Sequence, residues 1–148
     1  MRLLKILFVL FISINIDISN ADNTIIFSNY NFANTIYMDR LSIQRIFTKK
    51  ETRWSNGDNI IVFIKPMDSI EHKMFVSNIL NMTLYKYQKI LDESIYTAKS
   101  LPLTEVNNDI QMSTNIQNHP GAIGYINYNL LYGTKTIIIC DENCPKSK

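Results

Sequence analysis

The run NIIVFIKP, residues 59–66, is the segment that most constrains how this chain can fold. It holds an unbroken apolar stretch between the turn signal Asn56-Gly57 and Pro66. A continuous apolar run, without the polar alternation of a half-exposed strand, is typical of a strand covered on both faces. We therefore expect a layered fold, which 148 residues can build as one domain with a substantial core.

Strand and helix patterns follow one another along the rest of the chain. Segments rich in β-branched and aromatic residues predict further strands within 23–30, within 119–128 after the Pro120-Gly121 corner, and within 133–140. Strands separated by helices imply an α/β architecture with a mixed, mostly parallel sheet flanked by helices.

Apolar residues at helical spacing predict helices within four segments, 41–47, about 68–82, about 84–95 and about 104–117. In the second segment, Phe75, Ile79 and Met82 fall at positions i, i+4 and i+7, so one stripe of this helix faces a core. Thr104 or Asn107 would cap the last helix.

The N-terminal segment has the pattern of a secretory signal. A basic start is followed by an apolar run from Ile6 to Ile14 and by the small residues of Ser19-Asn20-Ala21. We expect residues 1–21 to be a signal peptide and residues 22–148 to be a mature domain, periplasmic or secreted. The alternative is an uncleaved membrane anchor, although the run is shorter than the ~20 residues of a spanning helix.

The two cysteines, Cys140 and Cys144, lie four residues apart near the C-terminus. Export to an oxidising compartment would allow a disulfide between them, closing a small loop. Free thiols are the alternative, and a metal site would need further ligands, because neither His72 nor His119 is near in sequence.

The composition and motifs exclude several classes of function. The net charge is only +2, and acidic residues are interspersed with basic ones, which argues against a nucleic-acid surface. The sequence holds no nucleophile–base pair, Gly-rich phosphate loop, zinc spacing or calcium loop. His72 falls beside Phe75 and Val76 on the apolar stripe, which favours a histidine at the edge of the core over a catalytic one. We expect neither an enzyme nor a cofactor.

Three segments, 41–63, 68–80 and 119–128, resemble in their order the substrate-binding proteins of bacterial phosphate ABC transporters. The matching residues are Ile46, Phe47, Trp54, Phe75, Pro120, Gly121, Ala122, Ile123, Gly124 and Tyr125. The resemblance covers about residues 25–139 and implies a type 2 periplasmic binding-protein fold. Since that fold has two lobes, this chain length implies a single lobe over residues 22–148. Trp54, Tyr125 and the two glycines are interpreted as packing and backbone residues rather than ligand contacts.

The resemblance also implies where an anion would bind. In that family an Arg and a Ser-Gly-Thr step hold phosphate at a strand-to-helix junction, and here Lys65 and Ser69-Ile70-Glu71 stand at these positions. Lys65 and Ser69 are therefore the expected ligand residues, although Lys65 lacks the bidentate fork of an arginine. A Glu71 carboxylate ~5 Å from a bound phosphate charge would repel it by about 3 kcal/mol at an effective dielectric constant of ~20.

The same residues have a local interpretation. Asp68 followed three positions later by Glu71 matches a capping box, which uses the backbone N–H groups that a phosphate would need. One set of donors cannot serve both, so a capped helix is the favoured interpretation.

Two hypotheses about function follow. In the first, the chain is an exported solute-binding-like domain that binds phosphate or another small anion weakly through Lys65 and Ser69. In the second, the domain keeps the lobe without the anion site and serves a structural, sensory or protein-interaction role, with a membrane or periplasmic protein as its partner.

Overall fold

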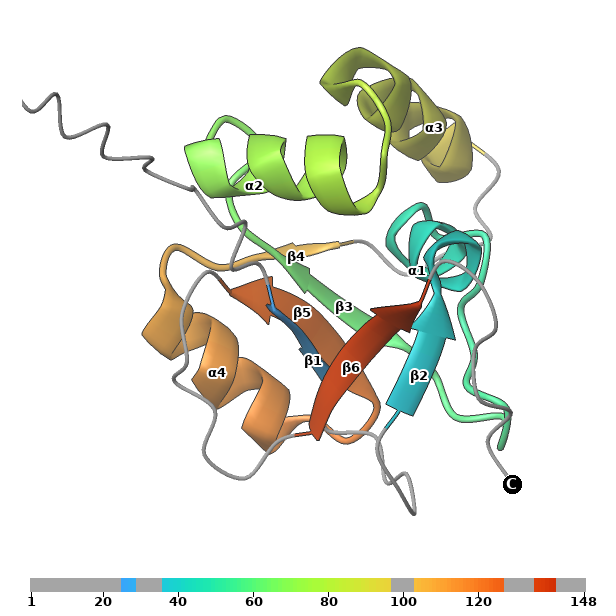
Figure 1. Ribbon diagram of the computed structural model, residues 1–148, viewed down its shortest axis with the longest axis vertical. Coiled ribbons are helices and arrows are strands. Elements are labelled where there is room, and N and C mark those ends of the chain that lie inside the picture. Colours follow the sequence, from blue (N-terminus) through green and yellow to red (C-terminus); the bar gives the residue numbers. More distant parts are fainter. Residues whose placement is uncertain (1–24, 29–35, 97–102, 127–134, 141–148) are drawn as a thin grey trace, which may run out of the picture.

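The computed structural model describes residues 25–28, 36–96, 103–126 and 135–140 (Figure 1). The strands within these residues are β1 (Ile25–Ser28), β2 (Ile36–Asp39), β3 (Ile61–Ile64), β4 (Thr104–Glu105), β5 (Ala122–Ile126) and β6 (Lys135–Cys140). The helices are α1 (Arg40–Phe47), α2 (Ile70–Met74), the π-helical continuation η1 (Phe75–Ile79), α3 (Leu84–Tyr96) and α4 (Asp109–Asn118).

The strands form one sheet in the order β2-β6-β1-β5-β3-β4. β1 runs antiparallel to both of its neighbours, β5 and β6. The pairs β2–β6, β3–β5 and β3–β4 are parallel. The prediction of a mixed, mostly parallel sheet flanked by helices is therefore confirmed.

Different helices cover the two faces of the sheet. Along β5, Ile123 and Tyr125 belong to a core cluster with residues of α1, η1 and α3, whereas Ala122 and Ile126 belong to a second cluster with residues of α4. Phe63 of β3 faces the α4 cluster while its two neighbours in the strand face the other one. Figure 1 shows α4 on one side of the sheet and α1, α2 and α3 on the other. The strand predicted from the apolar run is thus covered on both faces, as expected.

Gly124 lies where side chains of α4 pack on β5. A Cβ atom at this position would lie 2.6 Å from the Met112 sulfur and 2.7 Å from Cδ1 of Ile116. Those distances are inside van der Waals contact, so a larger residue at this position would require the ends of the Met112 and Ile116 side chains to move.

The helical segment formed by α2 and η1 ends against α1. The guanidinium of Arg40 donates to the carbonyl oxygens of Asn78 and Ile79, at 2.9 and 2.7 Å. The Gln44 amide donates to the carbonyl oxygen of Leu80 at 2.6 Å. These side chains satisfy carbonyl groups that have no partner at a helix end, which accounts for the position of the end.

Two strands and one cap differ from the prediction. β2 and β4 were not expected, and β4 consists of two exposed residues, Thr104 and Glu105, without an apolar pattern. Thr104 therefore belongs to a strand, and neither it nor Asn107 caps α4. The cap is Asn108, whose side-chain oxygen accepts a hydrogen bond from the Gln111 amide at 2.9 Å.

The predicted signal peptide, residues 1–21, lies outside the described residues and stays a prediction. The proposed disulfide also stays a prediction, because Cys140 ends β6 but Cys144 is outside the described residues. Among the helices that the structure describes, none has the length and apolar character needed to cross a bilayer.

Candidate functional site

The topology brings two helix N-termini to one edge of the sheet. β3 and β4 are parallel neighbours, so their carboxyl ends point to the same edge. α2 follows β3 on one face, and α4 follows β4 on the other. Adjacent parallel strands whose helices leave to opposite faces create the position where open α/β sheets bind ligands. We call this position the β3–β4 edge and define it by Lys65, Ser69, Asn108 and Asp109.

Lys65 lies at the centre of the β3–β4 edge, directly after β3. Lys65 is buried, with only 4% of its surface exposed. Its Nζ lies 2.5 Å from Oδ1 of Asp109, the first residue of α4. The Asp109 carboxylate is also well placed for the positive end of the α4 dipole. The charge of Lys65 is therefore compensated by a carboxylate of this chain.

This ion pair adds a carboxylate that the sequence interpretation did not include. Repulsion of an anion by Glu71 stays a prediction, and Asp109 is the acid that contacts Lys65. Asp109 was missed because it lies on a different helix from the loop that follows Lys65. The sequence did contain one sign of it: Asp109 directly follows the cap residue Asn108, and α4 starts at the same end of the parallel strands as Lys65.

Ser69 caps α2, and the expected Asp68–Glu71 capping box is not formed. The Ser69 hydroxyl accepts a hydrogen bond from the His72 amide at 3.1 Å, and α2 begins at the next residue. The reason is the preceding turn, in which the Ser69 amide donates to the Pro66 carbonyl at 2.9 Å and the helix starts one residue later than predicted. Glu71 then occupies the second helical position, from which it cannot complete a box with Asp68.

A buried pair of side chains lies behind this loop. The Tyr125 hydroxyl accepts a hydrogen bond from the Lys65 backbone amide at 3.0 Å and lies 2.6 Å from Nδ1 of His72. His72 is 0% exposed, and burial lowers its pKa from 6.5 to about 4. Burial also raises the pKa of Tyr125, so at neutral pH the histidine is uncharged and the phenol keeps its proton. The histidine that was expected at the edge of the core is fully inside it.

Apart from the exposed Pro120, the residues that carry the family resemblance are buried. Phe75 stacks on Tyr125 with ring centroids 3.8 Å apart, and it meets Phe47 edge-on at 4.7 Å. The Trp54 indole is buried and donates to the Gly121 carbonyl at 2.9 Å. Their interpretation as packing residues agrees with these contacts, except that the Tyr125 hydroxyl also reaches the loop after β3.

Gly121 has a backbone role at the corner before β5. Its φ is +80°, and a Cβ atom there would lie 2.6 Å from the Asn59 carbonyl oxygen. Only glycine tolerates both conditions, which explains the Pro-Gly corner without reference to a ligand.

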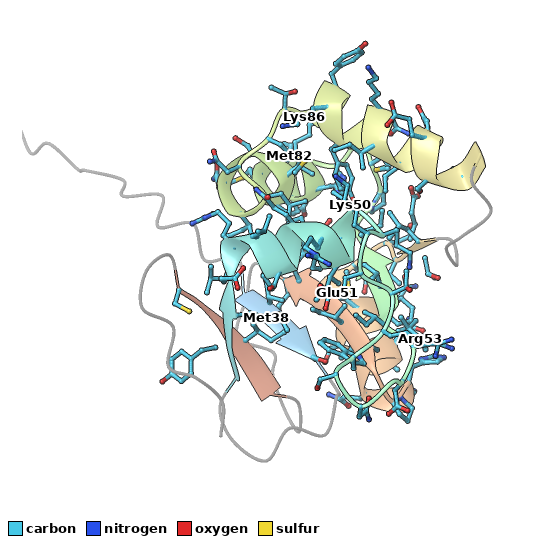
Figure 2. The ribbon with its side chains drawn as sticks, turned by 90° about the vertical axis from the view of Figure 1, so that its right-hand side faces the viewer. Met38, Lys50, Glu51, Arg53, Met82 and Lys86 are labelled. Atoms are coloured by element: carbon cyan, nitrogen blue, oxygen red, sulfur yellow. The ribbon has the colours of Figure 1, made fainter. Side chains whose placement is uncertain are left out.

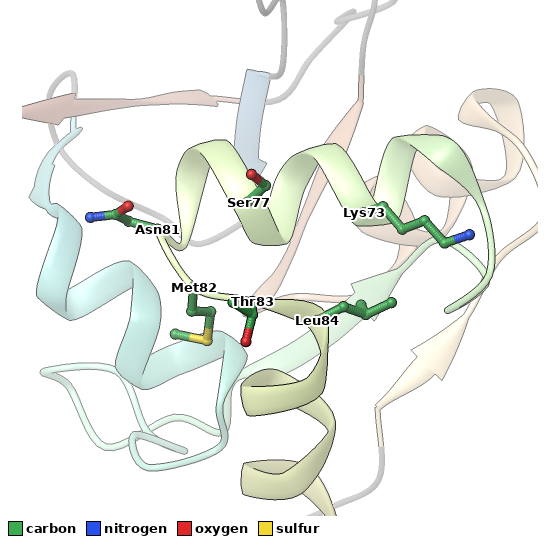
Figure 3. Close-up of a pocket in the computed structure, with 6 residues that line it drawn as sticks. All are labelled: Lys73, Ser77, Asn81, Met82, Thr83 and Leu84. Atoms are coloured by element: carbon green, nitrogen blue, oxygen red, sulfur yellow. The ribbon is translucent and has the colours of Figure 1, made fainter.

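A separate pocket lies between the α2–η1 segment and α3, away from the β3–β4 edge (Figure 3). It has a volume of about 570 Å³ and is lined by Lys73, Ser77, Asn81, Met82, Thr83 and Leu84. Neither Lys65 nor Ser69 contributes to it, and its one lysine is exposed. The pocket is open and offers no convergent set of charged groups for an anion.

The face that carries α1 and the following loop mixes charges of both signs. Lys50, Glu51 and Arg53 lie along this loop in Figure 2, and Glu51 pairs with Arg45 at 3.4 Å. Within the described residues, no group of three or more His, Cys, Asp or Glu side chains could hold a metal ion.

Comparison with known proteins shows the fold. No protein-family model and no curated protein matches the sequence. The structure is similar to a protein assigned as a phosphate ABC transporter substrate-binding protein from Clostridium perfringens, solved with bound phosphate, at a TM-score of 0.59 and 15% identity. It is also similar to an ABC-type phosphate transport receptor from Vibrio cholerae, at a TM-score of 0.59 and 17% identity.

The two similarities cover 78% of this chain but only 44% and 45% of the neighbouring chains. The chain thus has the periplasmic binding-protein fold and corresponds to a single lobe of it. At these identities the similarity establishes the fold relationship alone.

Proposed function

We propose that this chain is an exported solute-binding-like domain that binds a small oxyanion weakly at the β3–β4 edge. The ligand residues are Lys65 and Ser69, and the Asp109 carboxylate competes with the anion for Lys65. The single observation that carries the proposal is the ion pair between Lys65 and Asp109 at the position where this fold class binds ligands. Both neighbours are transport proteins, which supports a binding role rather than catalysis.

The ion pair supports weak rather than strong binding. An anion can contact Lys65 only if the Asp109 carboxylate moves away, or if both negative groups share one ammonium. Two unit negative charges ~5 Å apart repel by about 3 kcal/mol at an effective dielectric constant of ~20. An anion at this edge therefore loses roughly a hundredfold in affinity for each unit of its charge, less whatever salt screens.

Calorimetric titration with inorganic phosphate tests the proposal. Asp109→Asn removes the competing charge, so we expect phosphate to bind this variant at least about tenfold more tightly than the wild type. Asp68→Asn is the matched control, because it removes the same charge from an exposed residue of the loop between β3 and α2. The proposal is wrong if none of the three proteins binds phosphate at millimolar concentration, or if both variants gain affinity equally. Lys65→Ala should abolish any binding that Asp109→Asn reveals.

A second candidate is a protein-interaction domain that kept the lobe and lost the anion site. Two apolar side chains at the edge favour it: Ile70, the first residue of α2, and Ile110, the second of α4, are each 71% exposed. Between the two helix starts, Lys65 and Asp109 already compensate one another. Absence of phosphate binding in the Asp109→Asn variant would favour this candidate.

A further inference from the structure

Two buried residues, Tyr125 and His72, make hydrogen bonds with the loop that joins β3 to α2. Lys65 follows the last residue of β3 that is paired with β4, so its backbone amide lies beyond that ladder. Tyr125, from β5, supplies the acceptor for this amide at 3.0 Å. His72, from α2, supplies its own amide to the Ser69 hydroxyl at 3.1 Å and its ring to the Tyr125 hydroxyl at 2.6 Å. One connected set of bonds thus spans both ends of the loop.

The direction of these hydrogen bonds follows from the chemistry of the groups. A backbone amide can only donate, so the Tyr125 oxygen accepts from Lys65. The phenol then has one proton to donate, and the acceptor within reach among the described residues is Nδ1 of neutral His72. This bond direction requires the ring proton of His72 on Nε2, because the opposite tautomer would leave the phenol proton without an acceptor among the described residues.

His72 Nε2 is the one buried side-chain nitrogen or oxygen atom without a hydrogen-bond partner among the described residues. An unpaired buried N–H costs about 1–3 kcal/mol, and an apolar side chain at this position would avoid that cost. The hydrogen bond between Nδ1 and the Tyr125 hydroxyl explains why this position holds a histidine.

From these contacts we propose that Tyr125 and His72 are positioning residues for the anion site: together they fix the Lys65 amide and the Ser69 hydroxyl relative to one another. Because the Ser69 oxygen accepts from the His72 amide, its own O–H remains available to donate toward a ligand at the edge. This inference rests on the proposed function for its effect on binding, while its effect on the loop stands without it.

The test compares two buried tyrosines in the full chain. Tyr125→Phe removes the hydroxyl that holds Lys65. Tyr87→Phe is the matched control, since Tyr87 is equally buried and its ring also contacts the His72 ring, with centroids 5.3 Å apart, but its hydroxyl donates to the Phe47 carbonyl at 3.2 Å instead of holding Lys65. We expect hydrogen exchange of the Lys65 amide, followed by NMR, to accelerate at least about tenfold in Tyr125→Phe relative to Tyr87→Phe.

The second measurement is phosphate affinity in the Asp109→Asn background. Tyr125→Phe should weaken binding about fivefold to tenfold, whereas Tyr87→Phe should leave it unchanged. If Asp109→Asn alone does not bind phosphate, the proposed function fails, and the exchange of the Lys65 amide still decides the positioning role. Equal exchange rates in the two tyrosine variants would overturn the inference.

His72 provides a conservative rescue. His72→Asn keeps a side-chain oxygen that can accept from the Tyr125 hydroxyl, and His72→Leu does not. Protection of the Lys65 amide should persist in the first variant and fall in the second. In the wild type, ¹⁵N NMR of the imidazole should show the proton on Nε2, and a proton on Nδ1 at neutral pH would contradict the proposed bond direction.

Discussion

Two helices, α2 and α4, begin at the same edge of the sheet and are capped in similar ways. Ser69 caps α2 by accepting from the amide three residues later, and Asn108 does the same for α4. They differ in the carboxylate of the first turn. Asp109 of α4 contacts Lys65, whereas no ion pair joins Glu71 of α2 to Lys65, although Glu71 is closer in sequence. Proximity along the chain therefore does not decide which acid neutralises this lysine.

The residues at the third position of α2 and of α4 also differ. In α4 this position holds Gln111, whose side-chain oxygen accepts a hydrogen bond from the Asn107 amide at 3.0 Å. In α2 it holds His72, which is directed into the core. The reciprocal capping that the sequence indicated at α2 thus occurs, in a close variant, at α4.

The largest expected effect comes from breaking the ion pair of α4. Asp109→Asn leaves the buried Lys65 ammonium without its counter-charge, which should lower the free energy of unfolding by about 2–3 kcal/mol. Glu71→Gln, the corresponding change in α2, should alter it by less than about 0.5 kcal/mol. Urea denaturation of both variants measures the contrast, and equal losses would mean that Lys65 does not depend on Asp109.

The next largest effect is a dependence of the free energy of unfolding on pH, caused by His72 of α2. His72 has a pKa of about 4 in the folded chain and 6.5 when unfolded, so between these values the unfolded state binds more protons. Stability is therefore complete above the unfolded pKa and falls as the pH drops toward the folded one. Between about pH 7 and about pH 5 the loss should be about 2 kcal/mol.

Urea titrations at both pH values check this prediction, with His72→Asn as the control. The asparagine does not titrate, so its variant should lose about 2 kcal/mol less than the wild type over the same interval. A wild-type stability that is constant over this range would show that His72 is not buried as a neutral ring.

The two caps should contribute about equally. Ser69→Ala and Asn108→Ala each remove one side-chain acceptor from a helix start and should each cost about 1 kcal/mol of stability. Thermal unfolding of both variants measures this effect. Asp68→Ala serves as the control at α2 and should have almost no effect, because Ser69 is the cap. A loss with Asp68→Ala equal to that with Ser69→Ala would restore the original capping-box interpretation.

The smallest expected effect tests the contact made by Gln111, at the third position of α4. Gln111→Ala removes the reciprocal bond to the Asn107 amide and should cost about 0.5 kcal/mol. Thermal unfolding of this variant beside Thr114→Ala, a change at an exposed residue further along α4, would separate the cap contact from helix propensity. A loss in Gln111→Ala no greater than that in Thr114→Ala would contradict a role for the contact.

The elements that the sequence predicted well are those with a strong apolar signal. The buried strand β3, the helices α1 and α3 and the corner at Gly121 are all recognisable because burial, helical periodicity and positive φ each restrict the residue type. β4 was missed for the opposite reason: its two residues are exposed and carry no periodic pattern. The cap of α4 was misplaced by one residue because Asn107 and Asn108 have the same chemistry.

By itself, the sequence determined the α/β class, the doubly covered strand and the presence of a lysine and a serine between β3 and α2. Those features depend on residue type and on spacing of a few positions, which local physics can interpret. The tertiary structure alone decided that Lys65 meets Asp109 and that Tyr125 and His72 hold the loop. The physical reason is that these contacts join strands and helices far apart in the sequence: β3 with α4 across the two faces of the sheet, and β5 with α2 on one face.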